Sequence, residues 1–444
     1  MSEYRALFRL GLPVLVTQLG VIIVSFADTI MVGAYGVDQL AAAAFVNSLF
    51  FIPTVMQFGF AGGLTPLIGA LFARDDNHRA GRMLRAGMQA NALLSIGLTA
   101  IMGTIYFFLD KFGQPAELLP LIRSYYLIIL SSLLPMAVFN AFQQTCNGVN
   151  DTALPMWMIL GANVLNIAGN YLLIFGHLGL PELGLDGAGY STAAARYASS
   201  AALVVVFLRK KKFRCYMPGF HSREPLGELR RKVWNTSYPV MFQSGIECGL
   251  WSLGAVVSGW FGKIQLASFQ VVNTMSQLGF MTFISFGVAA SIRVANYTGV
   301  NDFKGIRRAT TAALHIVLGL ATIASLIFWF GGAHLIHVFS PDPEVIACAL
   351  TLILPMMVYQ YMDATQITYI NAIRGTSRVK PLLWISLISY IAVGTPAMLL
   401  LAKGCGLGNV GVYWSFNIAL IVAATLAVII FRRTVSAMEN PENN

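Results

Sequence analysis

Charged side chains are scarce in this chain of 444 residues. Only 11% of the residues are Asp, Glu, Lys or Arg, whereas 57% are hydrophobic, and soluble proteins carry roughly 25% charged residues. A water-exposed surface cannot be built from so few charges. The composition therefore excludes the several soluble domains that this length would otherwise suggest, and it indicates a membrane protein.

Sequence patterns typical of enzymes and of extracellular domains are also missing. The five cysteines are far apart and form no CxxC pair, which argues against a disulfide framework and a zinc ribbon. There is no GxxxxGK[ST] loop for ATP and no HExxH zinc motif. The six scattered histidines suggest no Ser–His–Asp arrangement. We therefore expect neither an enzyme nor a resident cofactor.

Long stretches without charge take the place of these features. Eight charge-free runs each exceed the ~20 residues needed to cross a ~30 Å hydrocarbon core. Lipid offers no partner for unpaired backbone groups, and the alternation of outer-membrane strands is absent, so the spans are predicted to be helices. We predict twelve spans, at approximately 10–33, 44–72, 86–109, 121–147, 154–176, 187–208, 233–261, 266–296, 309–339, 345–371, 381–402 and 408–431.

The positive charges indicate which helix ends face the cytoplasm. The net charge is +10, and 23 of the 29 Lys and Arg lie on the side that holds both termini. Four lie on the other side, and Arg196 and Arg293 fall inside spans. Because Lys and Arg gather on the cytoplasmic side of short loops, both termini are expected to be cytoplasmic. The basic excess indicates contact with anionic lipid rather than nucleic acid.

The two halves of the chain resemble each other. Residues 11–14 (GLPV) match residues 237–240 (SYPV) at an offset of 226, and Asp76 matches Asp302 at the same offset. Four further matches follow in chain order at offsets of 220 to 226. Six spans are an even number, so both copies enter the membrane in the same direction.

The repeat predicts an all-α membrane protein with twelve transmembrane helices in two six-helix bundles related by a pseudo-two-fold repeat. The expected boundaries are residues 1–208 for an N-terminal lobe, 209–232 for a basic cytoplasmic linker and 233–444 for a C-terminal lobe. Two such bundles suit alternating access, in which they rock about a central cleft.

Three carboxylates lie at membrane depth. Of the 19 Asp and Glu, only Asp28, Glu247 and Asp363 fall inside apolar segments. A carboxylate there costs ~2.5–3.5 kcal/mol on insertion scales, and such residues typically mark ion pathways. Tyr359 precedes Asp363 by four residues and so shares its helix face. The alternative is a neutral, hydrogen-bonded carboxyl between packed helices. Both a proton and Na⁺ suit these groups, and the residues alone do not choose between them.

Polar residues also follow one face of the fifth span. Asn163, Asn166 and Asn170 stand at i, i+3 and i+7, and Thr192 lies on the next span. These residues could hold a cation, or they could form interhelical hydrogen bonds. Arg196 follows Thr192 by one turn, where it could occupy the space that a cation needs, pair with a carboxyl, or extend toward the interface.

Motifs along nearly the whole chain resemble the multidrug and toxic compound extrusion (MATE) transporters, especially their NorM-like bacterial branch. The resemblance is carried by Leu12-Pro13, residues 26–31 (FADTIM) and 40–42 (LAA), Asn166, Asn170-Tyr171, residues 174–176 (IFG), Glu247, Tyr359 and Asp363.

The resemblance implies an antiporter of the bacterial inner membrane that exports amphipathic, often cationic drugs and toxic compounds in exchange for Na⁺ or H⁺. It assigns one cation site to the N-terminal lobe and a second, cation-responsive cluster to the other lobe. Its implied partners are a small-molecule drug and membrane lipid, and we expect a monomer that binds no nucleic acid. The residues so assigned are Asp28, Asn166, Asn170 and Thr192 for the first site, and Glu247, Tyr359 and Asp363 for the second. Some relatives carry a second Asp where this chain has Asn170, which removes one titratable group here.

Two other transporter classes fit part of the pattern. A flippase for a lipid-linked precursor, related in fold, would carry clustered cationic residues in its cavity, whereas only Arg196 and Arg293 lie in the predicted spans. A major-facilitator-type transporter fits the repeat, but its glycine- and arginine-rich loop signature matches residues 72–82 only loosely.

Overall fold

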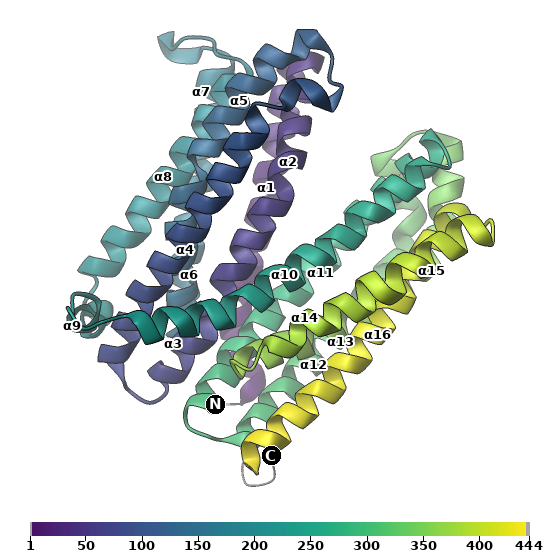
Figure 1. Ribbon diagram of the computed structural model, residues 1–444. Helices are drawn as coiled ribbons and strands as arrows, with labels where there is room; N and C mark the ends of the chain where they lie inside the picture. Colours follow the sequence, from purple (N-terminus) through teal and green to yellow (C-terminus); the bar gives the residue numbers. More distant parts are fainter. Residues whose placement is uncertain (1, 441–444) are drawn as a thin grey trace. The chain divides into compact units, whose positions relative to one another are not determined.

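The computed structural model describes residues 2–440, and its described part is helical without β-strands (Figure 1). Twelve helical segments in this part are long and apolar enough to cross a membrane, which confirms the predicted spans. The first half contains α1 (Glu3–Tyr35), α2 and α3 (Val37–Gly62 and Leu64–Phe72), α4 (Asn77–Tyr106), α5 and α6 (Leu119–Ser131 and Leu133–Gly148), α7 (Ala153–Ile174) and α8 (Leu185–Arg209). The second half contains α10 (Gly227–Gly259), α11 (Lys263–Gly299), α12 (Phe303–Phe339), α13 (Pro343–Gly375), α14 and α15 (Lys380–Ser386 and Thr395–Leu399) and α16 (Gly408–Glu439), with the short α9 (Met217–Phe220) between the halves.

Both halves contain the same turn before their third long helix. Asp75 and Asn301 adopt left-handed backbone conformations, with φ of 55° and 56°, which Asp and Asn tolerate better than most residues. The next residues, Asp76 and Asp302, cap α4 and α12 by accepting backbone hydrogen bonds at 3.0 Å and 2.8 Å. These pairs are 226 residues apart, so the backbone repeats at the offset found in the sequence.

The eleventh span is the least regular. Two π-helical stretches, Leu387–Gly394 and Leu400–Gly404, flank α15. Pro396 has no N–H to donate to residue 392, and a wider turn accommodates the missing hydrogen bond. Tyr390 lies in the first stretch and contributes to a site described below.

The contacts divide the chain into two compact units, each described here by itself. The N-unit is Val16–Met241, and the C-unit is Met1–Leu15 with Phe242–Asn444. This division differs from the expected lobes at 1–208 and 233–444 with a linker at 209–232. The first residues of α1 belong to the C-unit, and the linker and the first half of α10 belong to the N-unit.

The start of α1 packs in the C-unit and the first half of α10 packs in the N-unit, because their apolar side chains are buried there. In the C-unit, Leu7 and Leu10 join the core of α11 and α12, and a Cβ on Gly11 would lie 2.8 Å from the ring of Phe286. In the N-unit, the ring of Trp234 meets Phe60 edge to face at 4.9 Å. A Cβ on Gly63 would lie 2.7 Å from the Cα of Ser237. A division of the helices into two units by their order in the chain does not capture this packing.

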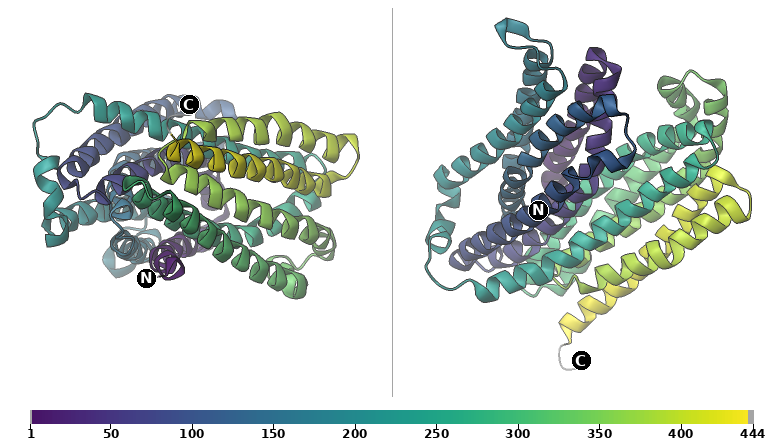
Figure 2. Two further views of the ribbon diagram at one scale, coloured as in Figure 1. Left: turned by 90° about the horizontal axis from the view of Figure 1, so that it is seen from below. Right: turned by 45° about the horizontal axis from the view of Figure 1, so that its top comes forward.

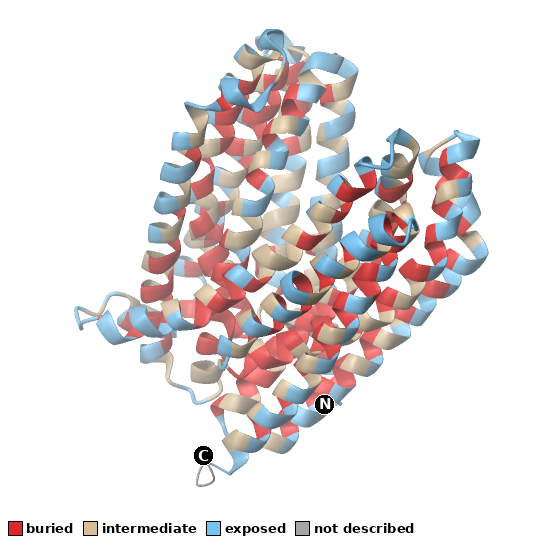
Figure 3. Cartoon of the chain, turned by 45° about the vertical axis from the view of Figure 1, so that its right-hand side comes forward, coloured by how far each residue is buried: buried red, intermediate tan, exposed pale blue. Residues whose placement is uncertain are grey.

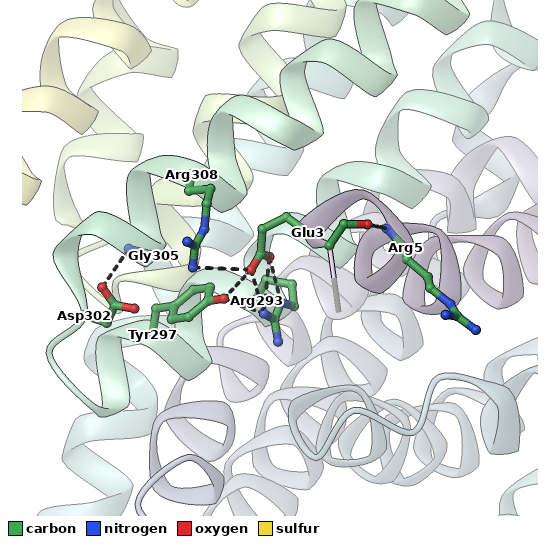
Figure 4. Close-up of polar contacts among 8 residues, drawn as sticks. Glu3, Arg5, Arg293, Tyr297, Asp302, Gly305 and Arg308 are labelled. Carbon is green, nitrogen blue, oxygen red and sulfur yellow. Dashed lines mark hydrogen bonds and ion pairs between the residues drawn. The ribbon is translucent and has the colours of Figure 1, made fainter.

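A polar network attaches the start of α1 to α11 (Figure 4). Glu3 is 8% exposed, and its carboxylate pairs with Arg293 through contacts of 3.1 Å and 3.2 Å. The hydroxyl of Tyr297 donates to Glu3 and accepts from Arg293 at 2.6 Å. Arg308 on α12 lies 3.8 Å from the same carboxylate. One of the two arginines inside predicted spans is therefore matched by an acid of its own unit.

We expect Glu3→Gln to destabilise the C-unit. The substitution removes the charge that compensates Arg293 in a largely buried network, and breaking such a pair is costly. The melting temperature of the detergent-solubilised protein should fall by about 3 °C, as expected for a loss of ~1–2 kcal/mol. Glu439→Gln is the matched control, because its 2.6 Å ion pair with Arg307 is exposed and should contribute little. Equal shifts for the two variants would contradict the structural role of Glu3.

Large apolar side chains cover the outward faces of both units. Figure 3 shows exposed residues along the outer surfaces of the helices and buried ones where helices pack. Ile30 is 69% exposed and Phe330 is 82% exposed. So much exposed apolar surface is typical of contact with lipid rather than water. Further views show α7 beside α8, and α13 beside α11 and α16 (Figure 2).

Candidate cation sites

The N-unit brings together the four residues that the sequence assigned to its site. The amide of Asn170 on α7 donates to the carboxylate of Asp28 on α1. One turn earlier, Asn166 donates to the hydroxyl of Thr192 on α8 at 3.1 Å. The amide nitrogen of Asn170 lies 3.5 Å from Oδ1 of Asn166. Asn166 and Asn170 are 3% and 0% exposed, so the cluster lies inside the helix packing.

Small residues allow these three helices to approach closely. A Cβ on Gly20 of α1 would lie 2.7 Å from the amide nitrogen of Asn163, and one on Gly169 of α7 would lie 2.4 Å from Oγ of Ser191. Ser191 donates to the backbone carbonyl of Asn166 at 2.6 Å, which sets α8 against α7. Asn163 is therefore a packing residue at the α1–α7 contact.

Oxygen atoms dominate this cluster. The carboxylate of Asp28, the hydroxyl of Thr192 and the side-chain carbonyls of the two asparagines are the ligand types that hard cations prefer. Oδ1 of Asn170 is buried and accepts no hydrogen bond from any described residue. A buried polar atom without a partner calls for an explanation, and a cation ligand role supplies one. The same carboxylate can instead hold a proton.

Two further residues act on Asp28 or on its neighbours, namely Arg196 and Tyr125. Arg196 of α8 donates from Nη1 to Oγ of Ser132 at 2.7 Å, and within residues 2–440 it forms no ion pair with a carboxylate. The charges of Arg196 and Asp28 nevertheless act on each other, and both act on the phenol of Tyr125 on α5. Of the three sequence-based alternatives for Arg196, the structure does not show the pair with a carboxyl, because its hydrogen bond goes to Ser132.

The C-unit holds the second group of acidic residues. Glu247 on α10 accepts a hydrogen bond from Gln243 at 2.6 Å and from Gln366 of α13 at 3.4 Å. Gln366 also donates to the hydroxyl of Tyr390 at 2.8 Å. The Oε1 atom of Gln243 accepts from Arg374 at the end of α13. Glu247 thus lies in a continuous chain of hydrogen-bonded side chains.

Asp363 lies on α13, one turn after Tyr359. It is 3% exposed, and no described residue donates a hydrogen bond to its carboxyl group. The charge of Glu247 acts on Asp363. The ring of Tyr359 is held among aromatic rings, with centroid distances of 5.5 Å to Trp251 and 6.2 Å to Tyr413. The structure therefore groups Glu247, Tyr359 and Asp363 in one unit.

The two units do not repeat each other at these positions. Residue 254 corresponds to Asp28 in the repeat, and it is a glycine over which the ring of Phe416 packs; a Cβ there would lie 2.5 Å from that ring. Residue 21 corresponds to Glu247, and it is an exposed valine. An aromatic contact and a lipid-facing side chain thus take the places of the acids, which explains why each unit carries its own chemistry.

Several residues of these sites went unnoticed in the sequence. Tyr125 and Tyr390 lie within apolar runs, and Gln243 and Gln366 resemble ordinary polar residues of a membrane helix. The tenth predicted span ended at residue 371 and left Arg374 in the loop that follows, but α13 continues to Gly375 and places Arg374 in its last turn. For Gln366 alone the sequence contained an indication. It follows Asp363 by three residues, so the two side chains share one face of the helix.

Comparisons with known proteins agree with this fold. The MatE family model matches residues 13–172 and 239–400. "Probable multidrug resistance protein NorM" of Bradyrhizobium diazoefficiens is 30% identical over 97% of this chain and 93% of its own length. The same-named protein of Photorhabdus laumondii is 26% identical over 97% of this chain and 95% of its own length.

Solved structures show the same architecture. A MATE transporter in a bent conformation has a TM-score of 0.90 at 16% identity and covers 100% of this chain and 98% of its own. A eukaryotic MATE transporter has a TM-score of 0.88 at 18% identity, with coverages of 99% and 98%. The family model covers both halves of the chain and the relative from Bradyrhizobium aligns along nearly all of it, so this protein belongs to the MatE family and is a transporter rather than an enzyme.

Proposed function

We propose that the protein is a cation-coupled antiporter that exports amphipathic, often cationic drugs and toxic compounds in exchange for Na⁺ or H⁺. The names of its bacterial relatives support multidrug resistance as the biological setting. The observation that carries the coupling is the N-unit cluster, in which a carboxylate and three neutral oxygen-bearing side chains meet inside transmembrane helices. Intramembrane carboxylates with such neighbours serve ion pathways.

The proposed cycle uses the two units as the moving parts of alternating access. A cation enters from outside, neutralises or orders the carboxyl groups, favours the outward-open state and weakens drug binding. Each positive charge that moves inward through 100 mV supplies ~2.3 kcal/mol. Because ~1.4 kcal/mol corresponds to a tenfold change in an equilibrium constant, one coupled charge supports more than tenfold accumulation of a neutral drug outside. A monovalent cationic drug carries one charge outward, so it needs a second coupled charge for the same accumulation.

The setting of this cycle is the bacterial inner membrane, with both termini in the cytoplasm. The uneven distribution of Lys and Arg supports this orientation, and the exposed apolar faces of both units support direct contact with lipid. The proposed working form is a monomer, because each unit carries its own acidic cluster. No bound cofactor is needed besides the coupling cation.

The identity of the coupling ion can be measured in proteoliposomes. Purified protein is reconstituted, ethidium serves as the drug, and Na⁺ and pH gradients are imposed separately. The expected result is ethidium-stimulated flux of one of these ions against the drug, with about tenfold accumulation at 100 mV for each coupled charge beyond the one that balances the charge of ethidium. Ion flux without drug would instead identify a channel, and drug transport insensitive to both gradients would contradict cation coupling.

The flippase alternative loses support in the structure. Arg293, one of the two arginines inside predicted spans, is neutralised by Glu3, and Arg196 and Arg374 lie in different units. The major-facilitator-type alternative is replaced by the MatE family match.

A further inference from the structure

Arg196 remains without a role in the proposed cycle. It lies on α8 at membrane depth, and a guanidinium there is costly unless a partner compensates it. A guanidinium has five N–H donors, yet the hydrogen bond that the structure shows for it goes to the neutral hydroxyl of Ser132. Ser132 itself donates to the carbonyl of Ile129 at 2.7 Å, so its oxygen is oriented to accept.

The acid whose charge acts on Arg196 belongs to the cation site itself. Thr192 is one helical turn, about 6 Å of rise, before Arg196, and it connects through Asn166 and Asn170 to Asp28. The charges of Arg196 and Asp28 act on each other. Arg196 is therefore a long, flexible cation about one helical turn from the residues that hold Asp28, and its hydrogen bond goes to a neutral oxygen.

The C-unit contains the same combination built from other positions. Arg374 donates to Oε1 of Gln243 and lies 3.5 Å from Oγ of Ser244. The amide nitrogen of Gln243 donates to Glu247 at 2.6 Å, so a single amide separates guanidinium from carboxylate. The charge of Arg374 acts on Glu247. Arg374 is in no ion pair with a carboxylate anywhere in the described chain.

These two arginines are not copies of one repeated residue. At the repeat offsets, residue 196 corresponds to Ile418 and residue 374 corresponds to Gly148. Duplication of one arrangement therefore does not account for both. Each unit has acquired a guanidinium, a neutral oxygen that holds it, and a carboxylate nearby.

We propose that Arg196 and Arg374 are tethered counter-cations of Asp28 and Glu247 that compete with the coupling cation. When the coupling cation is bound, each guanidinium rests on its neutral acceptor. When the cation leaves, the guanidinium pairs with the carboxylate and neutralises it. The inference rests on the proposed function, and it adds the means by which a carboxylate inside the membrane is compensated between one cation and the next.

Competition predicts opposite effects for two neighbouring substitutions. Arg196→Gln removes the competitor, so the half-saturating concentration of the driving cation should fall about tenfold, the effect of losing one nearby charge. Maximal efflux should fall as well, because cation release is no longer assisted. Ser132→Ala removes the neutral acceptor, so Arg196 stays on Asp28 and the half-saturating concentration should rise.

The test uses the full chain in proteoliposomes, with ethidium efflux titrated against Na⁺ and against pH. Arg196→Lys retains the charge and should remain within about threefold of the wild-type value. In the Asp28→Asn background, Arg196→Gln should no longer shift cation binding measured with ²²Na⁺ or by proton release. The matched experiment in the C-unit is Arg374→Gln, with Glu247→Gln as its background.

Each outcome bears on the inference separately from the proposed function. Shifts in the same direction for Arg196→Gln and Ser132→Ala, or no shift in either, would overturn the tethered counter-cation. If Arg196→Gln fails to fold, Arg196→Lys and Ser132→Ala still show in which direction the half-saturating cation concentration shifts. Loss of coupling in Asp28→Asn with unchanged affinity in Arg196→Gln would leave the proposed function intact. Full coupling in Asp28→Asn would contradict both.

Discussion

Asp28→Asn should abolish cation-driven efflux while leaving the fold of the N-unit intact. An asparagine has nearly the same shape, and its side-chain carbonyl can still accept the hydrogen bond from Asn170. The substitution removes only the charge, and with it the strongest cation ligand of the cluster. We expect drug transport under an imposed gradient to fall by at least the ~100-fold that loss of a supporting contact costs at metal sites.

The measurement is ethidium efflux from proteoliposomes of equal protein content, under the gradient that drives the wild type. Asp38→Asn is the matched control, because Asp38 is an exposed acid in the first turn of α2. The control should retain full activity. Melting temperatures of both variants should stay close to that of the wild type. Transport by Asp28→Asn at the wild-type rate would remove this carboxylate from the mechanism.

Replacement of the C-unit acids should change the number of cations that accompany each drug molecule. Glu247 receives hydrogen bonds from Gln243 and Gln366, whereas Asp363 receives none from the described residues. Two neighbouring carboxylates repel each other unless a cation or proton is shared between them. Asp363→Asn removes that repulsion, and with it the reason for a cation to bind.

We expect Asp363→Asn to reduce efflux about tenfold, the effect of one lost charge interaction, and Glu247→Gln to reduce it further. Cation binding at the N-unit should remain in both variants. The stoichiometry follows from the membrane potential at which drug flux reverses, and it should correspond to fewer cations per drug than in the wild type. An unchanged reversal potential would show that the C-unit acids do not carry the coupling ion.

Much of the membrane architecture follows from local sequence. Hydrocarbon demands apolar helices of a certain length, so twelve spans can be predicted from long apolar runs with few or no charges. The duplication is visible because Asp76 and Asp302 perform the same capping task in both halves. Asp28, Glu247 and Asp363 stand out because an acid inside an apolar run has no role in packing that outweighs its cost.

The ends of the helices and their partners are less predictable. The predicted span ended before Arg374, because an apolar run ends at a charge. A helix ends where its backbone hydrogen bonds end, and α13 continues to Gly375. The first residues of α1 belong to the C-unit, because Leu7 and Leu10 bury their side chains there. Neither fact is encoded in a local pattern.

The sequence by itself determined the class of protein, the number of spans, the repeat and the acids that mark the candidate sites, because these depend on composition and on periodicity within one helix. Only the tertiary structure decided which side chains meet. It brought Asn170 to Asp28, Gln366 and Tyr390 to Glu247, and a neutral acceptor to Arg196 and to Arg374. Such contacts join helices that are more than a hundred residues apart in several cases, and they depend on how the helices pack, which no local pattern records.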